Sequence, residues 1–89
     1  MEKLFYTNEF LKKLEPIIVK NDLKTVQKIK ETLAVIAEEG VEKSETIKLE
    51  NQKTKTGEDV FITEIQLERR VANLFWTIKK EQTIIITFI

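Results

Sequence analysis

The final third of the chain, VFITEIQLERRVANLFWTIKKEQTIIITFI at residues 60–89, decides the fold. It is rich in β-branched and aromatic residues, which is typical of β-strands. Apolar and polar side chains alternate at its start, so that one face carries Phe61, Ile65 and Leu67 and the other carries Glu64, Gln66 and Glu68. This period of two predicts a strand with one buried face.

Two more strands follow in this stretch. The segment VANLFWTI, residues 71–78, places Leu74, Trp76 and Ile78 on one face and Val71 and Phe75 on the other. The segment TIIITFI, residues 83–89, is apolar on both faces, which predicts a central strand covered on both sides. The basic pairs Arg69–Arg70 and Lys79–Lys80 fall at or near the intervening turns, so residues 60–89 predict a β-meander.

Helical spacing dominates the first half of the chain. A short apolar strand is expected at residues 3–7, followed by a helix capped by Thr7 or Asn8. Pro16 conflicts with one continuous helix, so we expect a stop near Leu14, a restart at Pro16 or a bend there. Apolar residues at helical spacing predict a second helix at residues 22–39, ending at Gly40. They are Leu23, Val26, Ile29, Leu33, Ile36 and Ala37.

The segment between the second helix and the meander predicts a hairpin. Ile47 and Leu49 flank Lys48 and indicate a short strand, and residues 51–59, NQKTKTGED, indicate a flexible polar loop. We therefore expect one α+β domain over residues 1–89. An N-terminal strand and two helices are followed by an antiparallel β-meander packed on the helices.

Composition excludes several function classes. The 15 basic and 15 acidic residues give a net charge of zero, which argues against strong non-specific nucleic-acid binding. The chain has no Cys and no His, so disulfides, thiolate zinc sites and histidine catalysis are excluded. No acidic cluster or phosphate-binding loop predicts a metal or a cofactor. No leader-like or membrane-spanning apolar run is present, and we expect a cytoplasmic protein.

Three stretches resemble the RelE/HigB superfamily of toxin–antitoxin toxins. They are the strand-to-helix segment FYTNEFLKKLEP, the glycine-ended helix IKETLAVIAEEG, and a sheet carrying TEIQ, NLFWTIKKEQ and TIIITF. The resemblance covers nearly the whole chain and rests mainly on apolar spacing. It implies a RelE-like fold and a ribosome-associated mRNA interferase, an endoribonuclease silenced by a cognate antitoxin protein.

The resemblance also implies where a site would lie, since such toxins use Arg, Lys and Tyr side chains on a concave sheet face. RNA cleavage needs a 2′-hydroxyl deprotonated, phosphate charge stabilised and a leaving oxygen protonated. The candidate catalytic residues are Arg69, Arg70 and Tyr6. The candidate RNA-binding residues are Lys48, Lys53, Lys55, Lys79 and Lys80. Each also has an ordinary interpretation, as a solvated charge or, for Tyr6, a packing residue.

The chain departs from the family at two positions. Gln66 and Asn73 stand where the family pattern places arginines, and residues 1–89 do not include the basic or aromatic tail that many members carry past the last strand. With Phe75, these two residues therefore also suit binding of a partner protein. A second hypothesis is a catalytically silent RelE-fold binding module or inhibitor. A third is a small structural or regulatory α+β protein that dimerises through a sheet edge.

Overall fold

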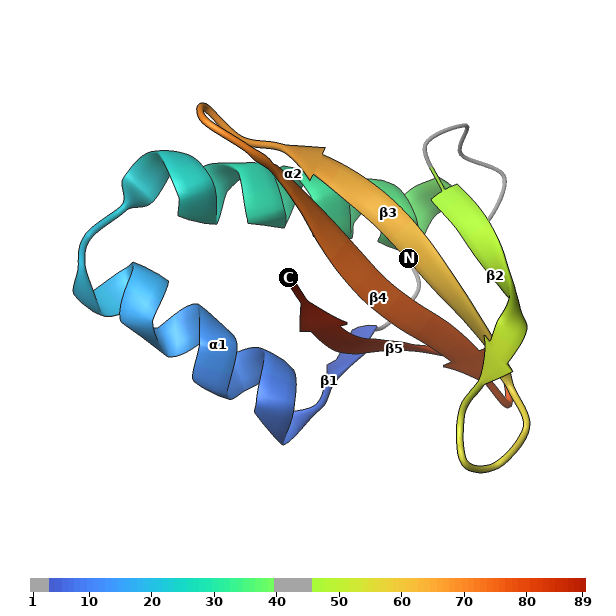
Figure 1. Ribbon diagram of the computed structural model, residues 1–89. Coiled ribbons are helices and arrows are strands. Elements are labelled where there is room, and N and C mark those ends of the chain that lie inside the picture. The colour runs from blue at the N-terminus through green and yellow to red at the C-terminus, as the bar shows by residue number, and fades with distance from the viewer. Residues whose placement is uncertain (1–3, 40–45) are drawn as a thin grey trace.

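The computed structural model describes residues 4–39 and 46–89 and confirms the α+β class (Figure 1). In chain order the elements are β1 (Leu4–Tyr6), α1 (Asn8–Val19), α2 (Leu23–Glu39), β2 (Thr46–Lys53), β3 (Asp59–Gln66), β4 (Val71–Lys79) and β5 (Gln82–Phe88). The strands form one sheet in the order β1-β5-β4-β3-β2. β1 pairs in parallel with β5, and the other neighbours are antiparallel.

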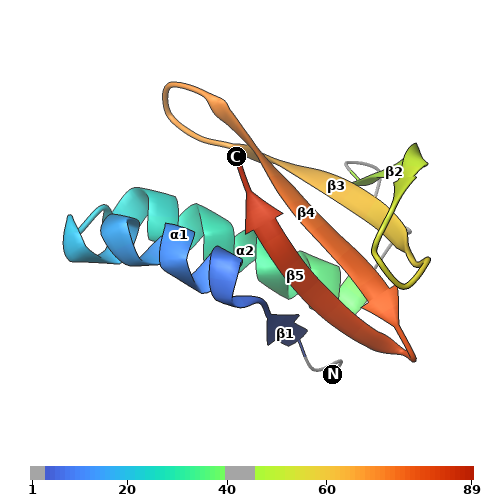
Figure 2. The same cartoon turned by 60° about the horizontal axis from the view of Figure 1, so that its bottom comes forward.

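Both helices lie on the same side of the sheet, so the molecule has two layers (Figure 2). α1 packs against β5 and α2 against β3. The sheet is strongly twisted, as connected antiparallel strands are. Neither described helix is long and apolar enough to cross a lipid bilayer.

Thr7 fixes the start of α1 to the sheet. Its hydroxyl oxygen accepts a hydrogen bond of 3.2 Å from the backbone N–H of Phe10, which caps the helix. The same hydroxyl donates to the carbonyl of Ile86 on β5. α1 then runs through Pro16 to Val19 without stopping at Leu14, so a single helix spans the segment where a break was one alternative.

α2 confirms the helix expected at residues 22–39. The middle of its predicted apolar stripe faces the sheet. Ile29 and Ile36 of that stripe are buried, whereas Leu23 at its start is exposed. Asn21 adopts a positive φ of 59°, which lets the chain reverse between the two helices. The predicted helix-ending Gly40 lies outside the described residues.

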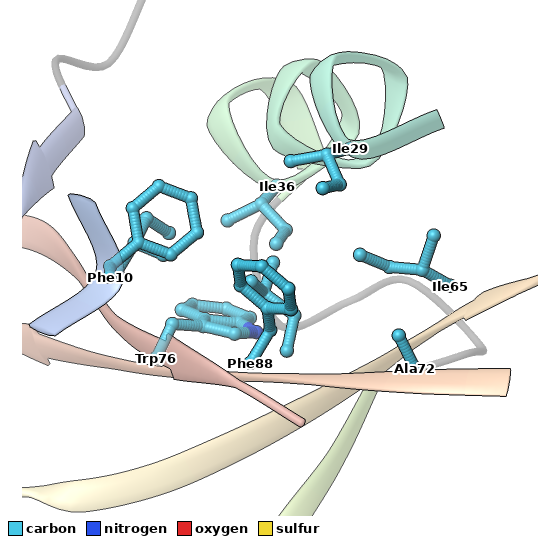
Figure 3. Close-up of a cluster of buried hydrophobic side chains, with 9 residues drawn as sticks. Phe10, Ile29, Ile36, Ile65, Ala72, Trp76 and Phe88 are labelled. Carbon is cyan, nitrogen blue, oxygen red and sulfur yellow. The ribbon is translucent and has the colours of Figure 1, made fainter. Parts of the chain in front are cut away.

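The core lies between the helices and one face of the sheet (Figure 3). Phe10 comes from α1, and the sheet contributes the fully buried Leu74 and Trp76 of β4. Phe10 meets Phe88 edge to face, with ring centroids 5.7 Å apart. The faces predicted for residues 61–67 and 71–78 are therefore confirmed, since Ile65 and Leu74 point toward the helices.

The loop predicted at residues 51–59 is shorter in the structure. β2 continues to Lys53 and β3 begins at Asp59, so only residues 54–58 form the connection. The N–H of Thr54 donates to the carbonyl of Glu58 at 2.9 Å, and Gly57 turns with a φ of 91°. The polar residues at the end of β2 indicate a loop, but they belong to an edge strand in which most side chains are exposed.

The sheet face opposite α1 and α2 is covered by neither described helix, although Val60 and Thr77 on it are buried. We call it the open face. Strand pairing places on it Ile47 and Leu49 of β2, Val60, Ile62, Glu64 and Gln66 of β3, Val71, Asn73, Phe75 and Thr77 of β4, and Ile84 and Thr87 of β5. β5 lies between two strands, as expected, but Ile84 and Thr87 on the open face are only half-buried, so the strand is not fully covered on both sides.

Candidate functional site

A cleft of about 950 Å³ opens between the beginning of α2 and the β3–β4 turn. We call it the basic cleft, because four of its side chains are cationic. Its lining residues are Asp22, Leu23, Lys24, Thr25, Gln27, Lys28, Gln66, Leu67, Glu68, Arg69 and Arg70. Arg69 and Arg70, two of the three candidate catalytic residues, therefore belong to one concave surface.

A tight turn presents the two arginines. The N–H of Leu67 donates to the carbonyl of Arg70 at 2.9 Å, which closes the loop directly after the last β3–β4 pair. Leu67 is half-buried and packs against the core, so it anchors the turn. Arg69 and Arg70 are exposed, and their guanidinium groups are available to an anion in the cleft.

Lys24 and Lys28 complete the basic cleft from the other side. They are four residues apart on α2 and therefore lie one above the other on the same face of the helix. Neither lysine is among the candidate site residues predicted from the sequence. The spacing of the pair was the available signal, but only the fold brings it opposite the β3–β4 turn.

Two carboxylates moderate the charge of the basic cleft. Asp22 caps α2, because its Oδ1 accepts from the N–H of Thr25 at 3.2 Å and its Oδ2 accepts from the Thr25 hydroxyl at 2.7 Å. These hydrogen bonds lower the pKa of Asp22 below its ordinary value. With Glu68, two carboxylates oppose four cations, so the lining of the cleft carries a net charge of +2 at neutral pH.

The candidate RNA-binding lysines lie elsewhere. Lys53, Lys55, Lys79 and Lys80 are at the end of the sheet where the β2–β3 and β4–β5 connections meet, opposite the β3–β4 turn (Figure 1). The nine-residue strand β4 separates the two ends by about 25 Å. The basic residues thus form two groups, and the structure does not bring them together.

Several of these lysines are engaged with carboxylates. Lys48 lies 3.4 Å from Asp59, and Lys53 forms a second ion pair with the same carboxylate. The hydrogen bond from Lys53 is the largest cause of the lowered pKa of Asp59, and the charge of Lys48 contributes. The pKa of Glu58 is lowered mainly by hydrogen bonds from Thr56 and Thr54, with a smaller contribution from Lys79.

Tyr6, the third candidate catalytic residue, does not line the basic cleft. It lies on the edge strand β1, and its ring stacks on Phe10 with centroids 5.4 Å apart. Strand pairing sets it beside Ile85. Its position fits the packing role that the sequence left open.

The candidate partner-binding residues share the open face. Ile62 pairs with Phe75, Glu64 with Asn73 and Gln66 with Val71. Gln66 also lines the basic cleft, while Phe75 lines a smaller hollow of about 440 Å³. Asn73 lies between them, and its backbone exchanges two hydrogen bonds of 2.9 Å with Ile89.

The described residues contain no group of three or more acidic side chains that could hold a metal ion. Comparison with known proteins finds no matching family model, no matching curated protein and no matching solved structure.

Proposed function

We propose that this protein is a RelE/HigB-type toxin whose basic cleft binds single-stranded mRNA. The resemblance in sequence motivates the proposal. The observation that supports the proposal is the basic cleft, which brings Arg69 and Arg70 together with Lys24 and Lys28 on one concave surface. A protein with no net charge needs such a local concentration of cations to hold an RNA backbone.

The cleft suits the phosphate part of RNA chemistry. A guanidinium binds a phosphate through two parallel hydrogen bonds, so Arg69 or Arg70 would hold the backbone in a fixed orientation and stabilise charge that develops on the phosphate. Lys24 and Lys28 would act as point charges on neighbouring phosphates. In this proposal the toxin cleaves mRNA at the ribosome and is silenced by a cognate antitoxin.

A catalytically silent RelE-fold binding module remains the second candidate. One observation favours it: Tyr6 lies outside the basic cleft, so the proposed phosphate clamp has no tyrosine beside it for proton transfer. Gln66, which does line the cleft, is uncharged where the family pattern has arginine. Such a protein would bind RNA or a partner without cleaving the RNA.

Expression in bacteria separates the two candidates. The toxin is expected to arrest growth and to cleave transcripts, and Arg69→Ala with Arg70→Ala is expected to abolish both effects. Arg69→Lys with Arg70→Lys keeps the charge but loses the bidentate geometry, so partial loss is expected. Purified protein is then incubated with a labelled RNA, with and without ribosomes.

A matched control removes two charges outside the cleft. Lys12 on α1 and Lys20 directly after it are both exposed, so Lys12→Ala with Lys20→Ala changes the net charge equally and should leave growth arrest intact. Binding of RNA without cleavage would support the silent module. Unchanged growth and intact transcripts, with no RNA binding, would eliminate the toxin proposal.

A further inference from the structure

Two leucines line the basic cleft, and the phosphate contacts proposed above give them no role. Leu23 is the first residue of α2, and Leu67 directly follows β3. The two leucines therefore come from the same two walls of the cleft that carry its lysines and its arginines. The cleft thus combines an apolar part with four cations.

Leu23 belongs to the apolar stripe of α2 but is not covered as the rest of the stripe is. Ile29 and Ile36 are 3% and 1% exposed, whereas Leu23 is 70% exposed. Val26, three residues after Leu23 and therefore its neighbour on the helix surface, is half-buried. The exposure of the stripe thus rises toward the beginning of α2, where Leu23 borders the cleft.

The beginning of α2 holds Leu23 in place. The side chain of Asp22 accepts from the N–H of Thr25 at 3.2 Å, and the carbonyl of Asp22 accepts from the N–H of Val26 at 3.1 Å. The N–H of Leu23 itself donates to the carbonyl of Asn21 at 2.9 Å. Leu23 is therefore a fixed part of the cleft wall, at the end of a capped helix.

Leu67 supplies an apolar surface on the facing wall. It is half-buried and packs against the core. Its N–H donates to the carbonyl of Arg70 at 2.9 Å, which fixes its backbone in the β3–β4 turn. Both leucines are therefore in position before a ligand arrives, so binding between them requires little further ordering of the protein.

A ligand that suits this lining carries both negative charge and apolar surface. The four cations favour an anion, and an exposed leucine gains free energy when apolar surface covers it. A nucleotide joins the two features in one unit, since its phosphate is anionic and its base has an apolar face. That face is accessible in an unpaired nucleotide, whereas stacking covers it inside a duplex.

From this combination we infer that Leu23 contacts an RNA base in the basic cleft. Its side chain packs against the face of an unpaired base, and the cations of the cleft hold the phosphates on either side of that nucleotide. Leu67 contacts the same base from the facing wall. The basic cleft therefore binds a nucleotide rather than a phosphate backbone alone.

This inference rests on the proposed binding of RNA and adds a second source of affinity to it. The cations attract any strand with the same phosphates, whereas Leu23 distinguishes strands by whether an unpaired base is present. Because every base has an apolar face, the contact selects unpaired nucleotides and not a particular sequence. The inference holds equally for a toxin and for a module that binds RNA without cleaving it.

The test compares two strands that carry the same phosphates. One is a single-stranded RNA oligonucleotide, and the other is an abasic strand of the same length that keeps the ribose and phosphate groups. Fluorescence anisotropy of the labelled strands measures their affinity for the full chain. The RNA should bind about five- to tenfold more tightly than the abasic strand, since only the RNA offers bases to Leu23.

Three variants assign the difference to Leu23. Leu23→Ser should weaken RNA binding about five- to tenfold without changing the affinity for the abasic strand or the salt dependence, because no phosphate contact is lost. Leu23→Phe should bind RNA at least as tightly as the natural chain, since an aromatic ring stacks on a base. The control is Leu11→Ser: Leu11 is 48% exposed on α1 and does not line the cleft, so both affinities should stay unchanged. Circular dichroism verifies that each variant is folded.

Other results would overturn the inference in distinguishable ways. Equal affinity for RNA and the abasic strand, or RNA binding that Leu23→Ser does not change, would refute the base contact and leave phosphate binding intact. An equal loss for both strands in Leu23→Ser would give the leucine a role in the shape of the cleft instead. Self-association of the free chain that Leu23→Ser abolishes would assign Leu23 to a contact between two copies. Absence of binding to either strand would refute the proposed function together with this inference.

Discussion

The indole N–H of Trp76 donates a hydrogen bond of 2.9 Å to the hydroxyl of Thr63, inside the core. Trp76 is fully buried and Thr63 is 4% exposed, so water cannot replace either partner. The same hydroxyl lies 2.8 Å from that of Thr46 on β2. This chain of three polar groups connects the central strand β4 to the edge strand β2 through β3.

Replacing Thr63 with Val should therefore destabilise the protein by about 1–3 kcal/mol. Valine fills the same space but leaves the indole N–H buried without an acceptor. Urea unfolding followed by circular dichroism measures the loss. In a Trp76→Phe background the same substitution should cost clearly less, because no indole donor remains; an equal loss in both backgrounds contradicts the assignment.

The β4–β5 turn should accept a stabilising double substitution. Lys80 and Glu81 adopt positive φ angles of 51° and 67°, a conformation that most residues other than Gly and Asn resist. Lys80→Asn with Glu81→Gly should raise stability by about 1 kcal/mol, measured by thermal unfolding. Lys80→Ala with Glu81→Ala removes the same charges without relieving the backbone, and it should bring no gain.

Acid should weaken the β2–β3 hairpin through Asp59. Its pKa in the folded protein lies below the ordinary value of 3.8, so its stabilising effect is present above that value and is lost as the pH falls through the lowered pKa. Asp59→Asn should reduce stability at neutral pH and flatten the pH profile below pH 4.

Thermal unfolding over a pH series measures that difference. Glu50 is an exposed carboxylate of β2 for which no ion pair is described, so Glu50→Gln is a suitable control. It should retain the acid-sensitive part of the profile. A profile of Asp59→Asn that matches the natural chain would contradict the role of this carboxylate.

The two lysines of α2 offer a test of the basic cleft that leaves its arginines in place. Lys24→Ala with Lys28→Ala should weaken binding of single-stranded RNA. The slope of log K against log salt should become shallower by about 0.7 for each phosphate contact removed. Fluorescence anisotropy at several salt concentrations measures both. Lys12→Ala with Lys20→Ala should leave the slope unchanged.

The element order and the buried faces of β3, β4 and α2 could be predicted from the sequence. Each follows from a local period, since Leu74 and Trp76 are two residues apart on a strand and Ile29 and Ile36 are seven apart on a helix. β2 was predicted too short because its last residues, including Lys53, are exposed. These residues belong to the sheet through backbone pairing, which the pattern of polar and apolar side chains does not reveal.

The candidate site was only partly predictable. The position of Arg69 and Arg70 at a turn followed from the flanking strand patterns. Their place beside Lys24 and Lys28 did not, because it depends on how the start of α2 meets a turn more than 40 residues later in the chain. The separation of Tyr6 from the cleft likewise follows from the strand order, which single-residue patterns do not determine.

The parallel pairing of β1 with β5 has a consequence for synthesis of the protein. The N–H of Thr7 donates to the carbonyl of Ile85, so the first described strand is held by the last. A nascent chain emerges from the ribosome with β1 and α1 first, but their partner is translated at the end. Until residues 82–88 leave the exit tunnel, Phe10 has no Phe88 to pack against. A chain stalled before that point therefore exposes its apolar residues to chaperones and proteases.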